Sequence, residues 1–116
     1  QVNIGELTTA AQENVNLVMI LMNSQDYEVI KNIQDAAYGG RKHYSDIYAP
    51  DFEAMASGAG WSYQKLSDLG RASTVLEGAV QTQGPTMIEV DMTAIGSYAK
   101  AFGGPPVRAA EMSKGR

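Results

Sequence analysis

Apolar residues along the chain fall into two kinds of pattern, and the two kinds alternate. Continuous apolar runs occupy residues 15–22 (VNLVMILM) and 86–92 (TMIEVDM), as in strands that are covered on both faces of a parallel sheet. The segment 61–66 (WSYQKL) alternates apolar and polar residues and also predicts a strand. Elsewhere apolar residues recur at the three- and four-residue spacing of helices. The predicted helices run from Asn3 to about Glu13, from about Tyr27 to Gly39, from Pro50 to Gly60 and from Ser67 to Gly84.

The ends of these predicted helices carry recognisable signals. Asn3 is a capping residue, and Glu6, three positions later, is placed to reach back to the backbone of Asn3. Pro50 is acceptable in a first helical turn, and Ser67 is a further capping residue. Glycine follows the second helix at Gly39-Gly40, as is common at helix C-termini.

Strands that alternate with helices predict an α/β fold, here a three-layer unit with a short parallel sheet flanked by helices. We expect this unit to occupy residues 1–92 and to form one partial domain. Residues 93–116 contain many Gly, Ala and Pro residues and are expected to be a loosely ordered C-terminal tail.

Composition excludes some classes of function. The chain has 116 residues, a formal charge of −4 and scattered basic residues, which argues against nucleic acid as a partner. The most apolar stretch has 8 residues (15–22), far short of the roughly 20 that cross a bilayer. Cysteine is absent, which fits a cytoplasmic location and excludes a disulfide framework. The single histidine, His43, lies in a polar segment and is interpreted as a surface residue.

Three stretches resemble the diphosphate-binding domain of thiamine-diphosphate-dependent enzymes, and within that family they are most similar to the acetolactate-synthase branch. They are residues 2–10 (VNIGELTTA), residues 20–30 (ILMNSQDYEVI), and a third set made of 50–60 (PDFEAMASGAG) together with 84–90 (GPTMIEV). Each motif is weak by itself, but the set covers residues 1–92. The resemblance implies thiamine diphosphate and Mg²⁺ as the cofactors of the parent enzyme.

The resemblance also suggests which residues would lie at the cofactor. A hard cation such as Mg²⁺ prefers oxygen ligands, and by the resemblance Asn23, Ser24 and Asp26 fall at or beside the metal-ligand positions. Tyr27 would line the cofactor, and Asn3 and Glu6 would lie near it on the preceding helix. Without the resemblance, residues 23–26 could equally be a strand end followed by a helix cap.

The sequence departs from the family pattern at this site. The family's Gly-Asp-Gly turn would precede Gln1, Ser24 stands where Asn or Asp is usual, and Glu28 stands where glycine is common. A serine hydroxyl is a poorer magnesium ligand than a carboxylate or amide oxygen, and Glu28 adds negative charge where a diphosphate would lie. These departures predict a weakened site. The family's catalytic glutamate comes from another domain, so no catalytic residue is assigned to this chain.

Two functions of different classes follow. In the first, the chain is a fragment of a thiamine-diphosphate-dependent lyase or transferase of the acetolactate-synthase or 2-oxo-acid decarboxylase type. It would contribute to metal-diphosphate binding without being catalytic alone, and its partners would be the missing domains. In the second, the chain is a free-standing, non-catalytic module that forms a homo-oligomer through its open sheet edge. An unrelated nucleotide-binding α/β domain would need a phosphate loop, which this sequence lacks.

Overall fold

The structure is a computed structural model that describes residues 3–96, and it divides into two units. The first unit comprises residues 3–24 and 49–96, and the second comprises residues 25–48. The elements in chain order are α1 (Glu6–Gln12), β1 (Val18–Asn23), α2 (Glu28–Tyr38), α3 (Phe52–Gly58), β2 (Ser62–Leu66), the 3₁₀ helix η1 (Leu69–Arg71), α4 (Ala72–Gln81), β3 (Thr86–Asp91) and α5 (Met92–Ile95). The expected tail, residues 93–116, lies outside the described residues from position 97 onward.

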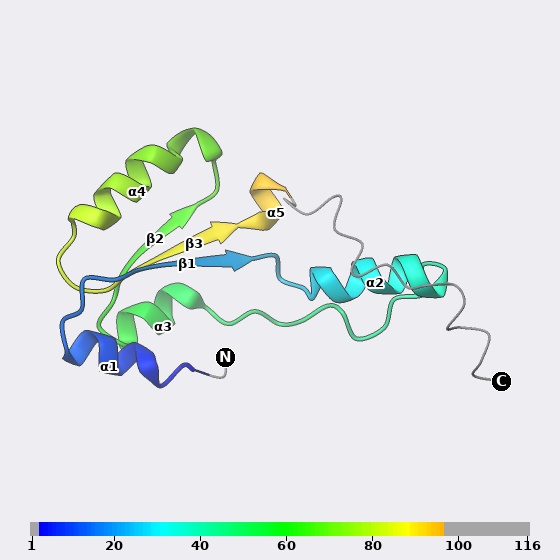
Figure 1. Cartoon of the computed structure of the whole chain (residues 1–116), viewed down its shortest axis with the longest axis horizontal. Helices are drawn as coiled ribbons and strands as arrows, with labels where there is room; N and C mark the ends of the chain where they lie inside the picture. The colour runs from blue at the N-terminus through cyan, green and yellow to red at the C-terminus, as the bar shows by residue number, and fades with distance from the viewer. Residues whose placement is uncertain (1–2, 97–116) are drawn as a thin grey trace. The chain divides into compact units, whose positions relative to one another are not determined.

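The first unit is built on a three-stranded parallel sheet in the order β1-β3-β2 (Figure 1). In the register, Ile88 of the central strand lies between Ile20 of β1 and Gln64 of β2. The central strand β3 is buried from Thr86 to Val90, as its apolar run predicts. The α/β prediction with a parallel sheet is therefore confirmed.

Helices cover both faces of this sheet because successive side chains of a strand point to opposite faces. On one face, Ile88 and Val90 pack with α4 residues Val75 and Ala79 and with Leu66 and Met92. On the other face, Met87 packs with Leu7 of α1, Ala56 of α3 and Trp61. The Trp61 indole Nε1 donates a buried hydrogen bond of 2.7 Å to the Leu7 carbonyl, which fastens α1 to the start of β2.

The outer face of β1 is less covered than its apolar run predicts. Ile20 is 53% exposed and Met22 is 49% exposed, so the expectation that this strand is buried on both faces is wrong for the described residues. The reason is that α4 packs on β2 and β3, while only Val18 of β1 packs against the core on that face. β1 is also an edge strand of this sheet.

Several element ends differ from the prediction. No side chain caps α1, whose first turn is closed by the Asn3 and Ile4 carbonyls accepting from the Glu6 and Leu7 amides. Pro50 precedes α3 instead of lying in its first turn, and Asp51 caps this helix; η1 is capped by Asp68 and not by Ser67. At the starts of α3 and η1, an aspartate next to the predicted residue accepts a hydrogen bond from a backbone amide, because a carboxylate is a strong acceptor.

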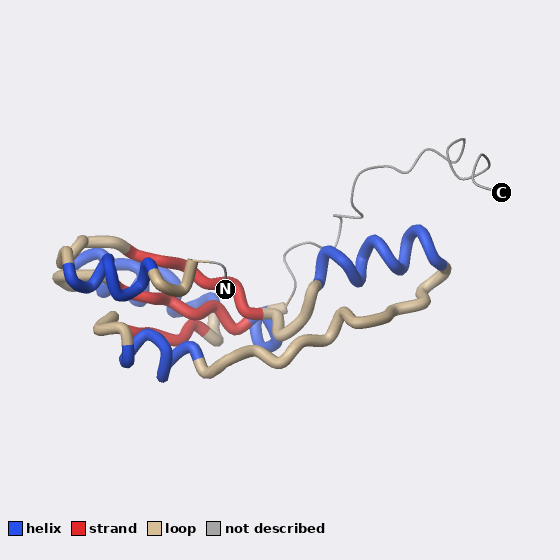
Figure 2. Tube along the Cα trace, turned by 90° about the horizontal axis from the view of Figure 1, so that it is seen from below, coloured by secondary structure: helices blue, strands red, loops and turns tan. Residues whose placement is uncertain are grey.

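The second unit contains α2 and the residues that follow it. Gly39 ends α2 in the left-handed conformation at φ 61°, as the Gly39-Gly40 pair predicts. Figure 2 shows a long stretch without helix or strand after α2. Residues of this stretch contact the residues that precede α2. The Tyr27 amide donates to the Ser45 carbonyl, and Asp26 pairs with Asp46 in an isolated antiparallel bridge.

Candidate functional site

A buried carboxylate joins the three strands toward their carboxyl ends. Glu89 on the central strand is only 6% exposed. Its Oε1 accepts from the Asn23 amide Nδ2 at 2.7 Å, and its Oε2 accepts from the Tyr63 hydroxyl at 2.5 Å. The register explains this contact: Glu89 lies opposite Leu21 and Lys65, so Asn23 and Tyr63 are diagonal neighbours on the same face.

The electrostatics of this cluster follow from burial and charge. Burial, and then the hydrogen bond and charge of Glu89, raise the pKa of Tyr63 well above its usual value. Tyr63 therefore stays protonated and donates, since both burial and a neighbouring anion disfavour the tyrosinate. Asp51 and Glu53, at the start of α3, add smaller effects of the same sign.

Asp91 and Lys65 continue this face at the ends of β3 and β2. The Asp91 carboxylate accepts from the Thr93 hydroxyl at 2.6 Å and from the Thr93 and Ala94 amides, so it caps α5. Lys65 Nζ lies 3.2 Å from Asp91 Oδ2. The Thr93 hydroxyl, and then Lys65, lower the pKa of Asp91 to about 2, and Asp91 in turn raises the pKa of Lys65.

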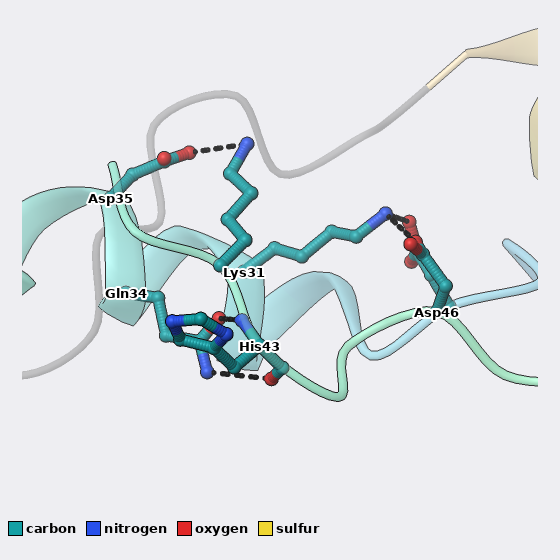
Figure 3. A network of polar contacts seen from close by, with 7 residues as sticks. Lys31, Gln34, Asp35, His43 and Asp46 are labelled. Carbon is teal, nitrogen blue, oxygen red and sulfur yellow. Dashed lines mark hydrogen bonds and ion pairs between the residues drawn. The ribbon is translucent and has the colours of Figure 1, made fainter.

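A second polar cluster lies within residues 25–48. Lys31 Nζ on α2 is 2.8 Å from Asp26 Oδ2 and 2.6 Å from Asp46 Oδ1. Figure 3 shows the Lys31 side chain extended toward Asp46. Asp35, further along α2, forms an ion pair with Lys42 at 3.0 Å. The hydrogen bonds to Asp26 and Asp46 raise the pKa of Lys31, so it remains an ammonium ion between two carboxylates.

The predicted site residues occupy different parts of the chain. Asn23 ends β1, and Ser24 follows it; both side chains are partly buried. Asp26 and Tyr27 precede α2, and Tyr27 is 54% exposed. Asn3 and Glu6 are exposed at the N-terminus of α1. In Figure 1, α1 and β1 run in opposite directions, and the N-terminus of α1 therefore lies toward the carboxyl end of β1.

The donor set can be tested against a magnesium diphosphate. The Asn23 amide donates through Nδ2 to Glu89, so its oxygen is turned away from that carboxylate. Asn23 and Ser24 carry neutral side-chain oxygen atoms, a donor type that fits Mg²⁺ when a diphosphate supplies the negative charge. The Asp26 carboxylate contacts the Lys31 ammonium through Oδ2, at 2.8 Å. Within residues 3–96, no three His, Cys, Asp or Glu side chains gather as metal ligands.

Sequence reasoning missed Glu89, Tyr63, Lys65 and Asp91. Glu89 and Tyr63 are 26 residues apart, and Asn23 and Glu89 are 66 residues apart, so no local spacing connects them. The available signal was a glutamate inside an otherwise apolar central strand, since an isolated buried charge is costly unless it is hydrogen-bonded. His43, interpreted as a surface residue, is exposed, and its backbone exchanges two hydrogen bonds with the Gln34 amide (Figure 3).

Polar residues gather at the carboxyl ends of the parallel strands. In α/β folds, ligands bind at this edge of the sheet. The family described as "Thiamine pyrophosphate enzyme, C-terminal TPP binding domain" matches residues 1–90, and the chain belongs to this family. The sequence-based resemblance is thereby confirmed.

The chain is acetolactate-synthase-like within this family. It is 30% identical over 99 residues to the acetolactate synthase isozyme 3 large subunit of Escherichia coli, which covers 84% of the chain and 17% of that protein. It is 29% identical over 87 residues to the acetolactate synthase catalytic subunit, mitochondrial, of Aspergillus candidus, covering 75% of the chain and 12% of that protein. The large subunit of Parasynechococcus marenigrum is 31% identical over 90 residues, 76% of the chain and 15% of that protein. The chain thus spans less than a fifth of the relatives' length.

Hydropathy adds one further finding. Among the helices that the structure describes, none combines the length and apolar character that a bilayer crossing requires.

Proposed function

We propose that this chain supplies part of the metal-diphosphate site of a thiamine-diphosphate-dependent enzyme of the acetolactate-synthase or 2-oxo-acid decarboxylase type. Asn23, Ser24 and the Asp26 carbonyl would provide oxygen ligands to Mg²⁺, and Tyr27 would line the cofactor. Asn3 and Glu6 would lie near it on α1. The cofactor supplies the carbon–carbon bond chemistry when it is bound; the chain's own residues bind and orient its diphosphate end.

The observation that supports this proposal most strongly is the fixed amide of Asn23. It stands at the carboxyl end of β1, and its Nδ2 is held by the buried Glu89. An amide that is oriented before the ligand arrives loses little conformational freedom on binding, which favours affinity. The family match over residues 1–90 supports a role in binding the cofactor.

Ser24 offers a gain-of-function test. Ser24→Asn would replace a hydroxyl by an amide oxygen at the position where the family usually has Asn or Asp. We expect thiamine diphosphate with Mg²⁺ to bind the full chain about tenfold more tightly, about 1.4 kcal/mol, as measured by ligand-induced thermal stabilisation.

Ser62→Asn is the matched control, because Ser62 is an exposed serine at the opposite, amino-terminal end of β2. It should leave the affinity unchanged. Equal effects of the two substitutions, or no gain for Ser24→Asn, would remove residue 24 from the site.

A second function is favoured by the exposed strand β1. Ile20 and Met22 are about half exposed, and the outer edge of β1 has no strand paired to it among the described residues. An apolar open edge promotes pairing with another strand. As the alternative, we propose that this chain self-associates through β1. Under the first proposal, the missing domains of the parent enzyme would cover this strand instead. A cytoplasmic location remains part of this proposal.

Sedimentation velocity tests the alternative. Self-association through β1 predicts a dimer that dissociates when Ile20 and Met22 are both replaced by Ser. A chain that stays monomeric at every concentration would contradict it.

A further inference from the structure

Residues 41–48, which we call the strap, follow α2 and contact the residues that precede this helix. The Tyr27 amide donates to the Ser45 carbonyl at 2.8 Å, and the Ile47 amide donates to the Gln25 carbonyl at 3.4 Å. Ser45 is only 3% exposed. No residue of α2 is buried within the described part of the chain, so a few polar contacts hold the strap in place.

These two hydrogen bonds place Asp26 and Asp46 directly opposite each other in the antiparallel bridge. A pair enclosed by such bonds is of the non-hydrogen-bonded type, in which the side chains lie closest together. Like charges directly opposite each other destabilise the pairing of two strands. Lys31 on α2 offsets this repulsion, because its Nζ lies 2.8 Å from Asp26 Oδ2 and 2.6 Å from Asp46 Oδ1 (Figure 3).

Backbone strain accompanies the bridge. Gln25 has φ 59° and Tyr44 has φ 54°, which is the left-handed region that residues other than glycine rarely adopt. Of the three such residues within 3–96, these two flank the bridge, one on each of its two segments. Strain of this kind persists only where surrounding contacts enforce it, and it favours segments that have two states.

The two ion pairs of Lys31 differ in their exposure to water. The Asp46 side chain is 88% exposed, whereas those of Lys31 and Asp26 are 24% and 21% exposed. Water screens the more exposed pair, which therefore contributes less and is more easily broken. Opening of the strap is thus expected to break the pair with Asp46 while Lys31 stays with Asp26.

We infer that the strap opens and closes over the start of α2, and that the Lys31 ammonium between Asp26 and Asp46 is the latch that holds it closed. Removal of this one charge leaves two facing carboxylates and two strained backbone positions, which together favour the open state. The closed strap fixes the backbone of residues 25–27, so the latch determines how ordered the entry to α2 is. The latch is independent of cofactor binding.

Lys31→Met tests the latch, because it keeps an unbranched side chain and removes the charge. Amide hydrogen exchange of the full chain, followed by nuclear magnetic resonance, should be about three- to tenfold faster at Tyr27 and Ile47, since an attraction is lost and a repulsion is left. The amides of β3 should exchange as in the unaltered chain, because the sheet does not depend on the latch. Unchanged exchange at Tyr27 and Ile47 would overturn the inference.

Lys42→Met is the matched control. It removes the same charge from the same unit, where Lys42 pairs with Asp35 at 3.0 Å and both side chains are about half exposed. The Tyr27 and Ile47 amides should stay within about twofold of their rates in the unaltered chain. Equal acceleration by the two substitutions would show that net charge, and not the position of Lys31, holds the strap, and would overturn the inference.

A second substitution tests whether repulsion opens the strap. Asp46→Asn combined with Lys31→Met removes one of the two facing charges, so only one carboxylate remains in the bridge. Exchange at Tyr27 and Ile47 should then return to within about twofold of the unaltered chain, because neighbouring sites couple. A double variant that exchanges as fast as Lys31→Met would contradict a latch that works by charge.

Discussion

Single residues at the carboxyl ends of the strands differ in how far the sequence reveals them. Asn23 and Ser24 are identified by a contiguous motif after an apolar run, and their prediction as metal ligands stays a prediction. Glu89 and Tyr63 are linked to Asn23 only by the sheet register, which sequence periodicity does not define. Asp26 is also predicted to lie at the metal site, and its carboxylate contacts Lys31, five residues later on α2.

Asp91 predicts an acid-sensitive step in stability. Its pKa is lowered from 3.8 to about 2 by the Thr93 hydroxyl and by Lys65, so the folded state favours the carboxylate. That stabilisation is fully present above about pH 4 and is lost as the pH falls toward 2. In urea denaturation at a series of pH values, Asp91→Asn should show a smaller loss in this window, because asparagine still caps α5 but does not titrate. Identical pH profiles would contradict this assignment.

Tyr63 predicts a change at the alkaline end. Its raised pKa means that the folded state favours the neutral phenol, so this contribution is present below about pH 10 and is lost as the pH rises further. In a titration followed by tyrosinate absorbance, Tyr63→Phe should remove the most alkaline step. Removal of a step at the ordinary tyrosine pKa near 10 would instead show that Tyr63 is not buried against Glu89.

At the scale of elements, periodicity predicts which segments form strands and which form helices. It does not predict which faces of these elements are buried by other elements. The run 15–22 predicts a strand buried on both faces, and β1 forms, but its outer face is half exposed because α4 packs on β2 and β3. A pattern of apolar residues indicates what a strand can bury, whereas burial depends on elements from elsewhere in the protein. Similarly, α2 forms as predicted, although none of its residues is buried within the described part of the chain.

Two isoleucines that are paired in the register provide a test of this difference. Ile88 is fully buried, whereas Ile20, its partner in β1, is 53% exposed. Ile88→Ala should lower the free energy of unfolding by about 2–5 kcal/mol. Ile20→Ala should change it by only about 0.5 kcal/mol when measured by urea denaturation of the monomer. Equal costs would mean that β1 is covered in solution.

The end of α2 gives a second prediction at this scale. Gly39 has φ 61°, and a Cβ there would have nothing within 4 Å, so conformation and not crowding requires glycine. Gly39→Ala should destabilise the end of α2 by about 1–2 kcal/mol, seen as faster amide hydrogen exchange in that helix. Gly5→Ala is the control, because Gly5 has φ −62° and equally open space. Equal protection of the α2 amides in Gly39→Ala and the unaltered chain would contradict the left-handed end.

At the scale of the whole molecule, the family is established over residues 1–90, and the chain spans 12–17% of the length of the relatives described. The half-exposed outer face of β1 is consistent with a part that works together with other domains. Sequence motifs could predict the family because they are contiguous. They could not predict the substrate, because the matched stretch is less than a fifth of the relatives' length.

Calorimetric titration of the full chain with thiamine diphosphate in the presence of Mg²⁺ tests the central claim most directly. We expect binding at micromolar affinity, about −8 kcal/mol, that requires Mg²⁺ and is lost in Asn23→Ala. Glu28→Gln should strengthen it, because one negative charge near the diphosphate is removed. The absence of any binding heat, together with no thermal stabilisation by the cofactor, would contradict the claim that this chain holds the metal-diphosphate end.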